Sequence, residues 1–123
     1  MMKLLVVDDE MDICDFVKNF FKERNFNVFV AHNGKEAVEL VKTEKPGIVL
    51  LDMMMPVMDG LEALKLIKEI DDKINVIMVT AVEDTEMYEE AKRHGAMEYI
   101  TKPLMLEQLE RTVLAISEQI RMS

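Results

Sequence analysis

Five short apolar runs, separated by longer segments with helical periodicity, constrain the fold of this chain more than any other feature. The runs cover residues 4–7, 28–31, 48–51 and 76–79, with a weaker one at 99–100. Continuous apolar runs of this length are typical of parallel strands that are buried on both faces of a sheet. The alternation predicts an α/β protein with a doubly wound, five-stranded parallel sheet and helices on both faces, because right-handed crossovers place them there.

The segments between the runs carry signals for the start, the buried face and the end of helices. Asn33 with Glu36, and Asp59 with Glu62, have the spacing of a helix N-cap and its reciprocating glutamate. Gly95 has the position of a residue that ends a helix. Apolar stripes predict the buried faces of the first and last helices: Ile13, Phe16, Val17, Phe20 and Phe21, and Leu106, Leu109, Val113, Ile116 and Ile120.

Composition narrows the class of protein. A chain of 123 residues is the size of one domain, so we expect a single domain over 1–123. Its 24 acidic and 15 basic residues give a net charge of −9, which argues against direct nucleic-acid binding. No apolar run reaches the roughly 18 residues that span a bilayer, so we expect no membrane insertion. Cys14 is the single cysteine, and together these features favour a cytoplasmic location.

Polar side chains stand at the ends of four predicted strands. Asp8 and Asp9 follow the first run, Asp52 follows the third, Thr80 ends the fourth and Lys102 follows the fifth. The carboxyl ends of parallel strands meet at one edge of a sheet, where such folds bind ligands. Strand ends also meet solvent, which by itself explains a single polar residue. Three neighbouring carboxylates, however, need a cation, and Mg²⁺ prefers oxygen ligands. With an amine and a hydroxyl they predict a phosphoryl-transfer site, in which an aspartate can serve as nucleophile.

Four motifs follow one another along the chain: Asp8-Asp9-Glu10, the segment Asp-Met-Met-Met-Pro-Val-Met-Asp-Gly at 52–60, Thr80-Ala81 and Lys102-Pro103. Together they resemble response-regulator receivers of two-component phosphorelay signalling, of the single-domain, chemotaxis-regulator-like kind. The resemblance covers essentially the whole chain and implies the flavodoxin-like fold with strand order 2-1-3-4-5. Gly47 stands where many receivers have an aspartate, a departure that touches no catalytic position.

The resemblance implies a role for each residue of the predicted site. Asp52 would be the phosphoacceptor. Asp9, Asp52 and the backbone carbonyl of Met54 would bind Mg²⁺, and Asp8 would support the metal through water. Lys102 would pair with the phosphoryl oxygens.

The same resemblance implies a switch and two kinds of partner. Thr80 would hydrogen-bond a phosphoryl oxygen, and Tyr99 would be the aromatic residue that turns inward when Thr80 moves. The phosphoryl group would come from a histidine kinase or a histidine phosphotransfer protein. The downstream protein target would bind the fourth helix, fifth strand and fifth helix. The chain would catalyse its own phosphorylation and dephosphorylation without being a conventional turnover enzyme. The Lys102-Pro103 bond would be cis.

Other classes of protein fit the motifs less well. A haloacid-dehalogenase-type phosphatase has a second aspartate two residues after the first, where this chain has Met54. The acidic residues after the first run would repel the phosphate of a flavodoxin-like electron carrier, and the glycine-lysine loop of a nucleotide switch is absent. A receiver-shaped interaction module that is never phosphorylated stays open as the alternative. The resemblance places Met54 and Val82 at the entrance to the acceptor, and their apolar side chains predict slow loss of the phosphoryl group.

Overall fold

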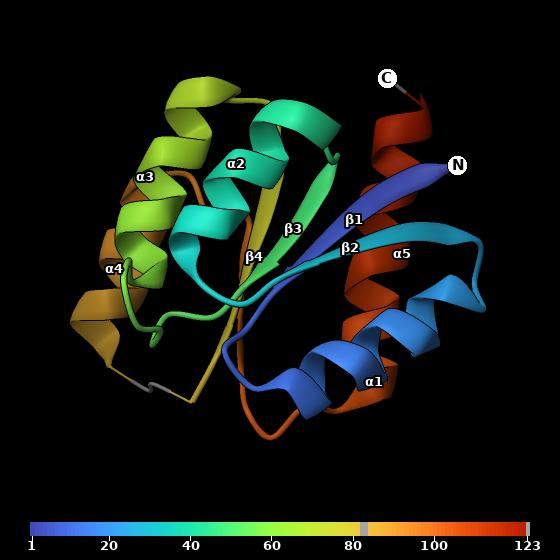
Figure 1. The fold of residues 1–123 in the computed structure, drawn as a ribbon, viewed down its shortest axis with the longest axis horizontal. Helices are drawn as coiled ribbons and strands as arrows, with labels where there is room; N and C mark the ends of the chain where they lie inside the picture. The colour runs from blue at the N-terminus through green and yellow to red at the C-terminus, as the bar shows by residue number, and fades with distance from the viewer. Residues whose placement is uncertain (82–83, 123) are drawn as a thin grey trace.

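The computed structural model describes residues 1–81 and 84–122, in which strands and helices alternate along the chain (Figure 1). No helix in these ranges is long and apolar enough to cross a membrane. The elements are β1 (Met2–Val7), α1 (Met11–Lys22), β2 (Phe26–Ala31), α2 (Gly34–Glu44), β3 (Ile48–Leu51), α3 (Gly60–Ile70), β4 (Asn75–Thr80), α4 (Thr85–Arg93), β5 (Glu98–Thr101) and α5 (Leu106–Met122).

The strands form one parallel sheet in the order β2-β1-β3-β4-β5, so the predicted fold class and strand order are confirmed. Helices α1 and α5 lie on one side of the sheet, and α2, α3 and α4 lie on the other (Figure 1). Because strand order reverses between β1 and β3, the first crossover runs one way from β1 and the later ones run the other way. The carboxyl ends of β1 and β3 are therefore neighbours at the centre of the sheet.

Alternate strand residues face the two helical layers and build two hydrophobic clusters. Leu5 and Val7 of β1 pack toward α2 and α3, whereas Leu4 and Val6 pack toward α1 and α5. The central strands β1, β3 and β4 are buried on both faces as predicted, but Val28 and Val30 of β2 are only partly buried. The reason is that β2 lies at an edge of the sheet, where one long side has no neighbouring strand.

The predicted N-caps at Asn33 and Asp59 and the helix end at Gly95 are confirmed. The side chains of Asn33 and Asp59 each accept a hydrogen bond of 2.9 Å from the backbone N–H three residues later. Gly95 follows α4 with φ of +97°, a left-handed conformation that favours glycine.

The predicted stripe of α1 is wrong at one position. Phe16 is 57% exposed, while Cys14, which the predicted stripe does not include, is fully buried. Cys14 lies three and seven residues before the buried Val17 and Phe21, so it shares their face of the helix. Its thiol also donates a hydrogen bond of 3.2 Å to the backbone carbonyl of Asp8.

Candidate functional site

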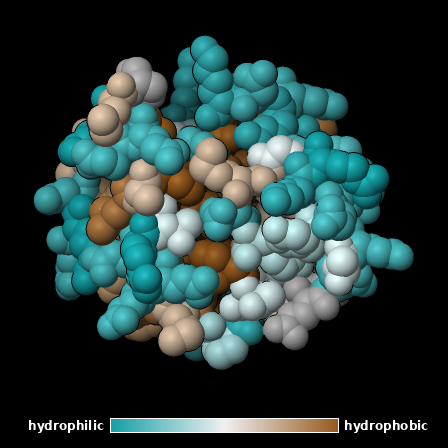
Figure 2. Space-filling model, turned by 180° about the vertical axis from the view of Figure 1, so that it is seen from behind, coloured by the Kyte–Doolittle hydropathy of each residue, from teal (hydrophilic) through white to brown (hydrophobic). Residues whose placement is uncertain are grey.

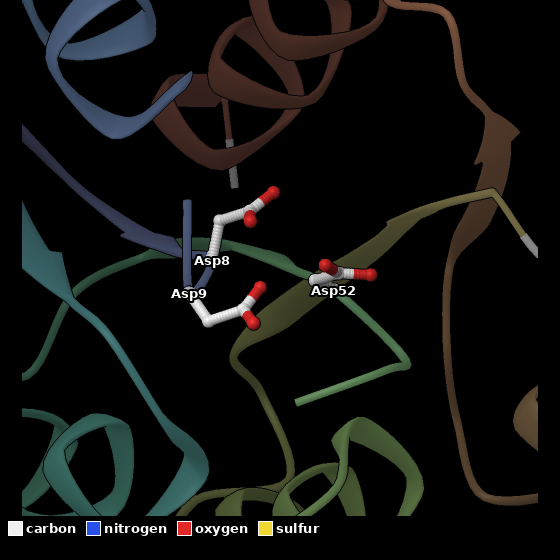
Figure 3. Close-up of side chains that lie close together, drawn as sticks. All are labelled: Asp8, Asp9 and Asp52. Atoms are coloured by element: carbon white, nitrogen blue, oxygen red, sulfur yellow. The ribbon is translucent and has the colours of Figure 1, made fainter. Parts of the chain in front are cut away.

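Three carboxylates meet at the carboxyl edge of the sheet. Asp8 and Asp9 follow β1, Asp52 follows β3, and one oxygen of each lies within 4.8 Å of the others (Figure 3). The backbone N–H of Asp52 donates to the carbonyl of Val7 at 3.0 Å, which ties the two strand ends together. Asp8 and Asp52 are only 4% and 5% exposed, whereas Asp9 is exposed. Parallel pairing of β1 with β3 thus produces an acidic site that is partly closed to solvent.

Lys102 brings a positive charge to this site. Its Nζ lies 2.8 Å from Oδ2 of Asp8 and 3.4 Å from Oδ2 of Asp52. The backbone N–H of Lys102 donates to the carbonyl of Thr80 at 2.8 Å, which anchors the end of β5 to that of β4. The Lys102-Pro103 peptide bond is cis, as predicted.

Glu10 is a neighbour of Lys102 to which the sequence assigned no role. Its Oε1 lies 3.8 Å from the Lys102 Nζ, and its side chain is 63% exposed. Its backbone N–H donates to Oδ1 of Asp8 at 3.0 Å, so the turn after β1 is shaped by an aspartate of the site. The only sequence signal was its place directly after Asp9, because its approach to Lys102 depends on β5 packing nearby.

Burial raises the pKa of Asp52 above its ordinary value of 3.8, and the charge of Asp8 raises it further. Lys102, the Met54 N–H and a hydrogen bond with the Thr80 hydroxyl act in the opposite direction without cancelling the shift. Burial lowers the pKa of Lys102, but its hydrogen bond to Asp8 and the charges of Asp52 and Asp8 outweigh burial and leave that pKa raised. The Lys102 amine is therefore protonated. The charged form of Asp52 is destabilised by its surroundings, and a further cation would stabilise it.

Thr80 and Tyr99 connect the acidic site to the neighbouring strands. Thr80 is fully buried at the end of β4, and its hydroxyl forms a hydrogen bond with the Asp52 side chain. Tyr99 pairs with Met78 of β4 and is partly buried. Burial raises the pKa of Tyr99, and the negative charges of Asp84 and Asp52 raise it further. The Tyr99 hydroxyl is therefore within electrostatic reach of the site.

The loop that begins at the predicted acceptor Asp52, residues 52–59 and here called the acceptor loop, is held tightly at both ends. The backbone N–H of Met54 donates to Oδ1 of Asp52 at 3.3 Å, and that of Gly60 donates to the carbonyl of Met53 at 2.8 Å. A Cβ at Gly60 would lie 2.1 Å from the Asp52 carbonyl oxygen, so only glycine fits there. Met53 is buried in the core, whereas the Met54 side chain is 61% exposed beside the acceptor.

The tip of the acceptor loop contains a strained residue. Val57 has φ of +70°, in the left-handed region that β-branched residues rarely adopt, and its side chain is 77% exposed. Val57→Gly should raise the free energy of unfolding by about 0.5–1 kcal/mol, because relief of strain exceeds the entropy that glycine adds to the unfolded chain. Urea unfolding measures this. Val57→Ala keeps the strain and serves as the control, and an equal gain in both variants would contradict the explanation.

The carboxylate cluster has the donor set of a hard divalent cation. Three carboxylates face one ammonium group, and Asp9 has no hydrogen-bond or ion-pair partner for its side chain among residues 1–81 and 84–122. Oxygen ligands at this spacing suit Mg²⁺, which keeps several waters and is held by one or two carboxylates. The residues present therefore fit such an ion.

Comparison with known families assigns the chain to a class. The family model of the response regulator receiver domain matches residues 4–114. The chain belongs to this family, and it is a receiver domain of two-component signalling.

Two curated relatives match this chain over most of its length and most of their own. It is 39% identical over 111 residues to the sporulation initiation phosphotransferase F of Bacillus subtilis (strain 168), with 90% of each chain covered. It is 44% identical over 116 residues to the chemotaxis protein CheY of Listeria monocytogenes, with 90% of this chain and 98% of the relative covered.

Solved structures agree with the fold. The receiver domain of the Francisella response regulator 1452 has a TM-score of 0.90 at 32% identity, covering 98% of this chain and 99% of that one. The complex of CheX, CheY, BeF₃ and Mg²⁺ from Borrelia burgdorferi contains a chain with a TM-score of 0.88 at 31% identity, covering 94% of this chain and 88% of that one.

Proposed function

We propose that this receiver is a phosphoacceptor domain that catalyses Mg²⁺-dependent transfer of a phosphoryl group from a partner phosphohistidine to Asp52. The observation that carries the proposal is the position of Asp52, 5% exposed, in contact with Lys102 and Thr80 and beside two further carboxylates. The solved complex of CheX, CheY, BeF₃ and Mg²⁺ from Borrelia burgdorferi contains a chain similar to this one, which supports the same chemistry here.

In the proposed reaction an Asp52 oxygen forms a bond to phosphorus as the bond from phosphorus to the partner's histidine nitrogen breaks. The electron pair of that bond stays with the departing imidazole. Lys102 moves from its contacts with Asp8 and Asp52 to pair with the phosphoryl oxygens, and the Thr80 hydroxyl donates to one of them. Mg²⁺, held by Asp9, Asp52 and the Met54 carbonyl with Asp8 acting through water, would neutralise the charge that gathers there.

The same contacts explain how phosphorylation would change the surface that binds a downstream partner. When Thr80 turns from Asp52 to the phosphoryl group, Tyr99 moves with it and alters the face made by α4, β5 and α5. A shift of a few kcal/mol between two populated states is enough to change partner binding. A cavity of about 680 Å³ lies between the start of β5 and α5, lined among others by Met97, Arg111 and Ile116. The back of the molecule also exposes hydrophobic side chains at its centre, ringed by hydrophilic ones (Figure 2).

The proposed partners are a histidine kinase or histidine phosphotransfer protein that supplies the phosphoryl group, and a protein target that binds the altered face. As part of the proposal, residues 1–123 form one receiver domain. The names of the relatives, a sporulation initiation phosphotransferase and a chemotaxis protein, support partners of this general kind.

The proposed function is tested by the mass of the intact chain after incubation with acetyl phosphate and Mg²⁺. The wild type should gain one phosphoryl group that is stable in acid and lost in base, as expected for an acyl phosphate. Asp52→Asn should gain none, while Asp72→Asn, which removes an exposed carboxylate far along the chain, should behave like the wild type. Equal uptake by Asp52→Asn and the wild type would contradict the assignment of the acceptor.

The exposed Met54 side chain should slow the loss of the phosphoryl group, because it cannot orient an attacking water by a strong hydrogen bond. Met54→Asn should speed first-order decay about 2- to 12-fold, the effect of one hydrogen bond. Met122→Asn, at the exposed end of α5, is the matched control. Decay that is unchanged or slower in Met54→Asn would refute this idea. Val82, assigned to the same entrance, lies outside the described residues.

A further inference from the structure

The chain has two tyrosines and no tryptophan, and the two tyrosine rings touch. Tyr88 lies on α4 and Tyr99 on β5, with ring centroids 5.5 Å apart and planes at 82°, an edge-to-face contact. Such a contact has a preferred geometry and adds free energy beyond the area it buries. The pair therefore joins the outer helix to the edge strand at one defined point.

Tyr99 is the inner member of the pair. It packs against the hydrophobic cluster between the sheet and helices α2, α3 and α4. Its hydroxyl is subject to the charges of Asp84, at the start of α4, and of Asp52. A change of charge at Asp52 therefore acts electrostatically on the Tyr99 hydroxyl.

Tyr88 is the outer member, 36% exposed. The Nζ of Lys92, one turn further along α4, lies 5.5 Å from the Tyr88 ring centroid. A cavity of about 180 Å³ beside the pair is lined by both rings together with the small side chains of Ala91 and Ala96. This space permits the rings to shift without displacing the core.

We propose that Tyr88 is a positioning residue of the switch, whose edge-to-face contact couples the position of the Tyr99 ring to the exposed face of α4 at Tyr88 and Lys92. The inference rests on the proposed phosphorylation of Asp52. An aromatic contact of this kind biases a two-state equilibrium by about 2- to 12-fold. Coupling between two sites acts in both directions, so a change at Tyr88 should also alter binding at Asp52.

Tyrosine fluorescence tests whether a change at Asp52 reaches Tyr88. In a variant with a single tyrosine, the emission reports on that one ring. In Tyr99→Phe the remaining Tyr88 keeps a ring to contact, and its emission should change when beryllium fluoride and Mg²⁺ are added. In Tyr99→Ala the contact is lost, and Tyr88 emission should not respond. A response of equal size in both variants, or in neither, would overturn the coupling.

The reverse direction is tested by the affinity for beryllium fluoride in the presence of Mg²⁺, followed by amide chemical shifts. Tyr88→Ala should change this affinity by about 2- to 12-fold. Tyr88→Phe should restore the wild-type value, and Glu89→Ala, an exposed neighbour on α4, should leave it unchanged. Wild-type affinity in Tyr88→Ala would overturn the inference.

Intact mass after treatment with acetyl phosphate separates the two ways of failing. Normal uptake at Asp52 with no response of Tyr88 would overturn the coupling alone. Absence of uptake in the wild type would overturn the proposed function and this inference with it.

Discussion

Lys102→Ala should lower the rate of Asp52 phosphorylation by about 100- to 1000-fold, the effect of removing one preorganised donor from a charged transition state. Among the described residues, Lys102 alone forms ion pairs with both Asp8 and Asp52. Its loss also removes an influence that lowers the pKa of Asp52, so more of that carboxyl would be protonated and unable to attack. Initial rates with acetyl phosphate and Mg²⁺, followed by intact mass, measure the effect.

Two variants isolate the role of Lys102. Lys102→Arg keeps the charge but changes its shape, and should retain an intermediate rate. Lys65→Ala removes an exposed lysine of α3 and should leave the rate at the wild-type value. A wild-type rate in Lys102→Ala would show that this amine does not take part in the transfer.

Mg²⁺ should increase the free energy of unfolding by about 2.7 kcal/mol at a concentration one hundred times its Kd, because it binds the folded carboxylate cluster and not the unfolded chain. Urea unfolding at several Mg²⁺ concentrations gives the measurement. Asp9→Asn should lose most of this gain and most of the phosphorylation rate, whereas Asp72→Asn should keep both. Equal stabilisation of the Asp9→Asn variant would place the ion elsewhere.

In a chelator the same cluster should make stability depend on pH in a definite direction. The pKa of Asp52 is higher in the folded chain than its ordinary value of 3.8, so between these two values the folded state holds more protons. The contribution of Asp52 to stability is therefore full below its unfolded pKa and is lost as pH rises through its folded pKa. Asp52→Asn removes this loss and should stabilise the metal-free chain at neutral pH. A less stable variant there would contradict the direction of the shift.

The fold was predictable because its main determinants are local or repeat along the chain. The apolar runs located every strand. Strand pairing begins slightly before two of these runs and includes the polar residues Lys3 and Asn75. The helix caps at Asn33 and Asp59 depend on side chains three residues apart, which a sequence displays directly. The convergence of Asp8 and Asp52 followed from the geometry of parallel strands.

The features that the sequence did not predict depend on packing between distant segments. Burial of Cys14 in place of Phe16 depends on how α1 is rotated against the sheet. The approach of Glu10 to Lys102 joins segments about ninety residues apart, and the edge-to-face contact of Tyr88 with Tyr99 depends on the tilt of α4. The left-handed Val57 has no sequence signal, since a β-branched residue argues against that conformation.

The acceptor loop has two fixed ends and an exposed tip, and these parts can serve different purposes. Its two ends are fixed by the strand pairing of Asp52 and by the close approach of Gly60 to the Asp52 backbone, so the acceptor and the start of α3 form one rigid unit. The tip around Val57 is exposed and lies away from these constraints. Substitutions at the tip can therefore change which partner surfaces fit against the site without displacing the acceptor. Under the proposed function, the tip is therefore a position at which the choice of phosphodonor can be altered while the transfer reaction is preserved.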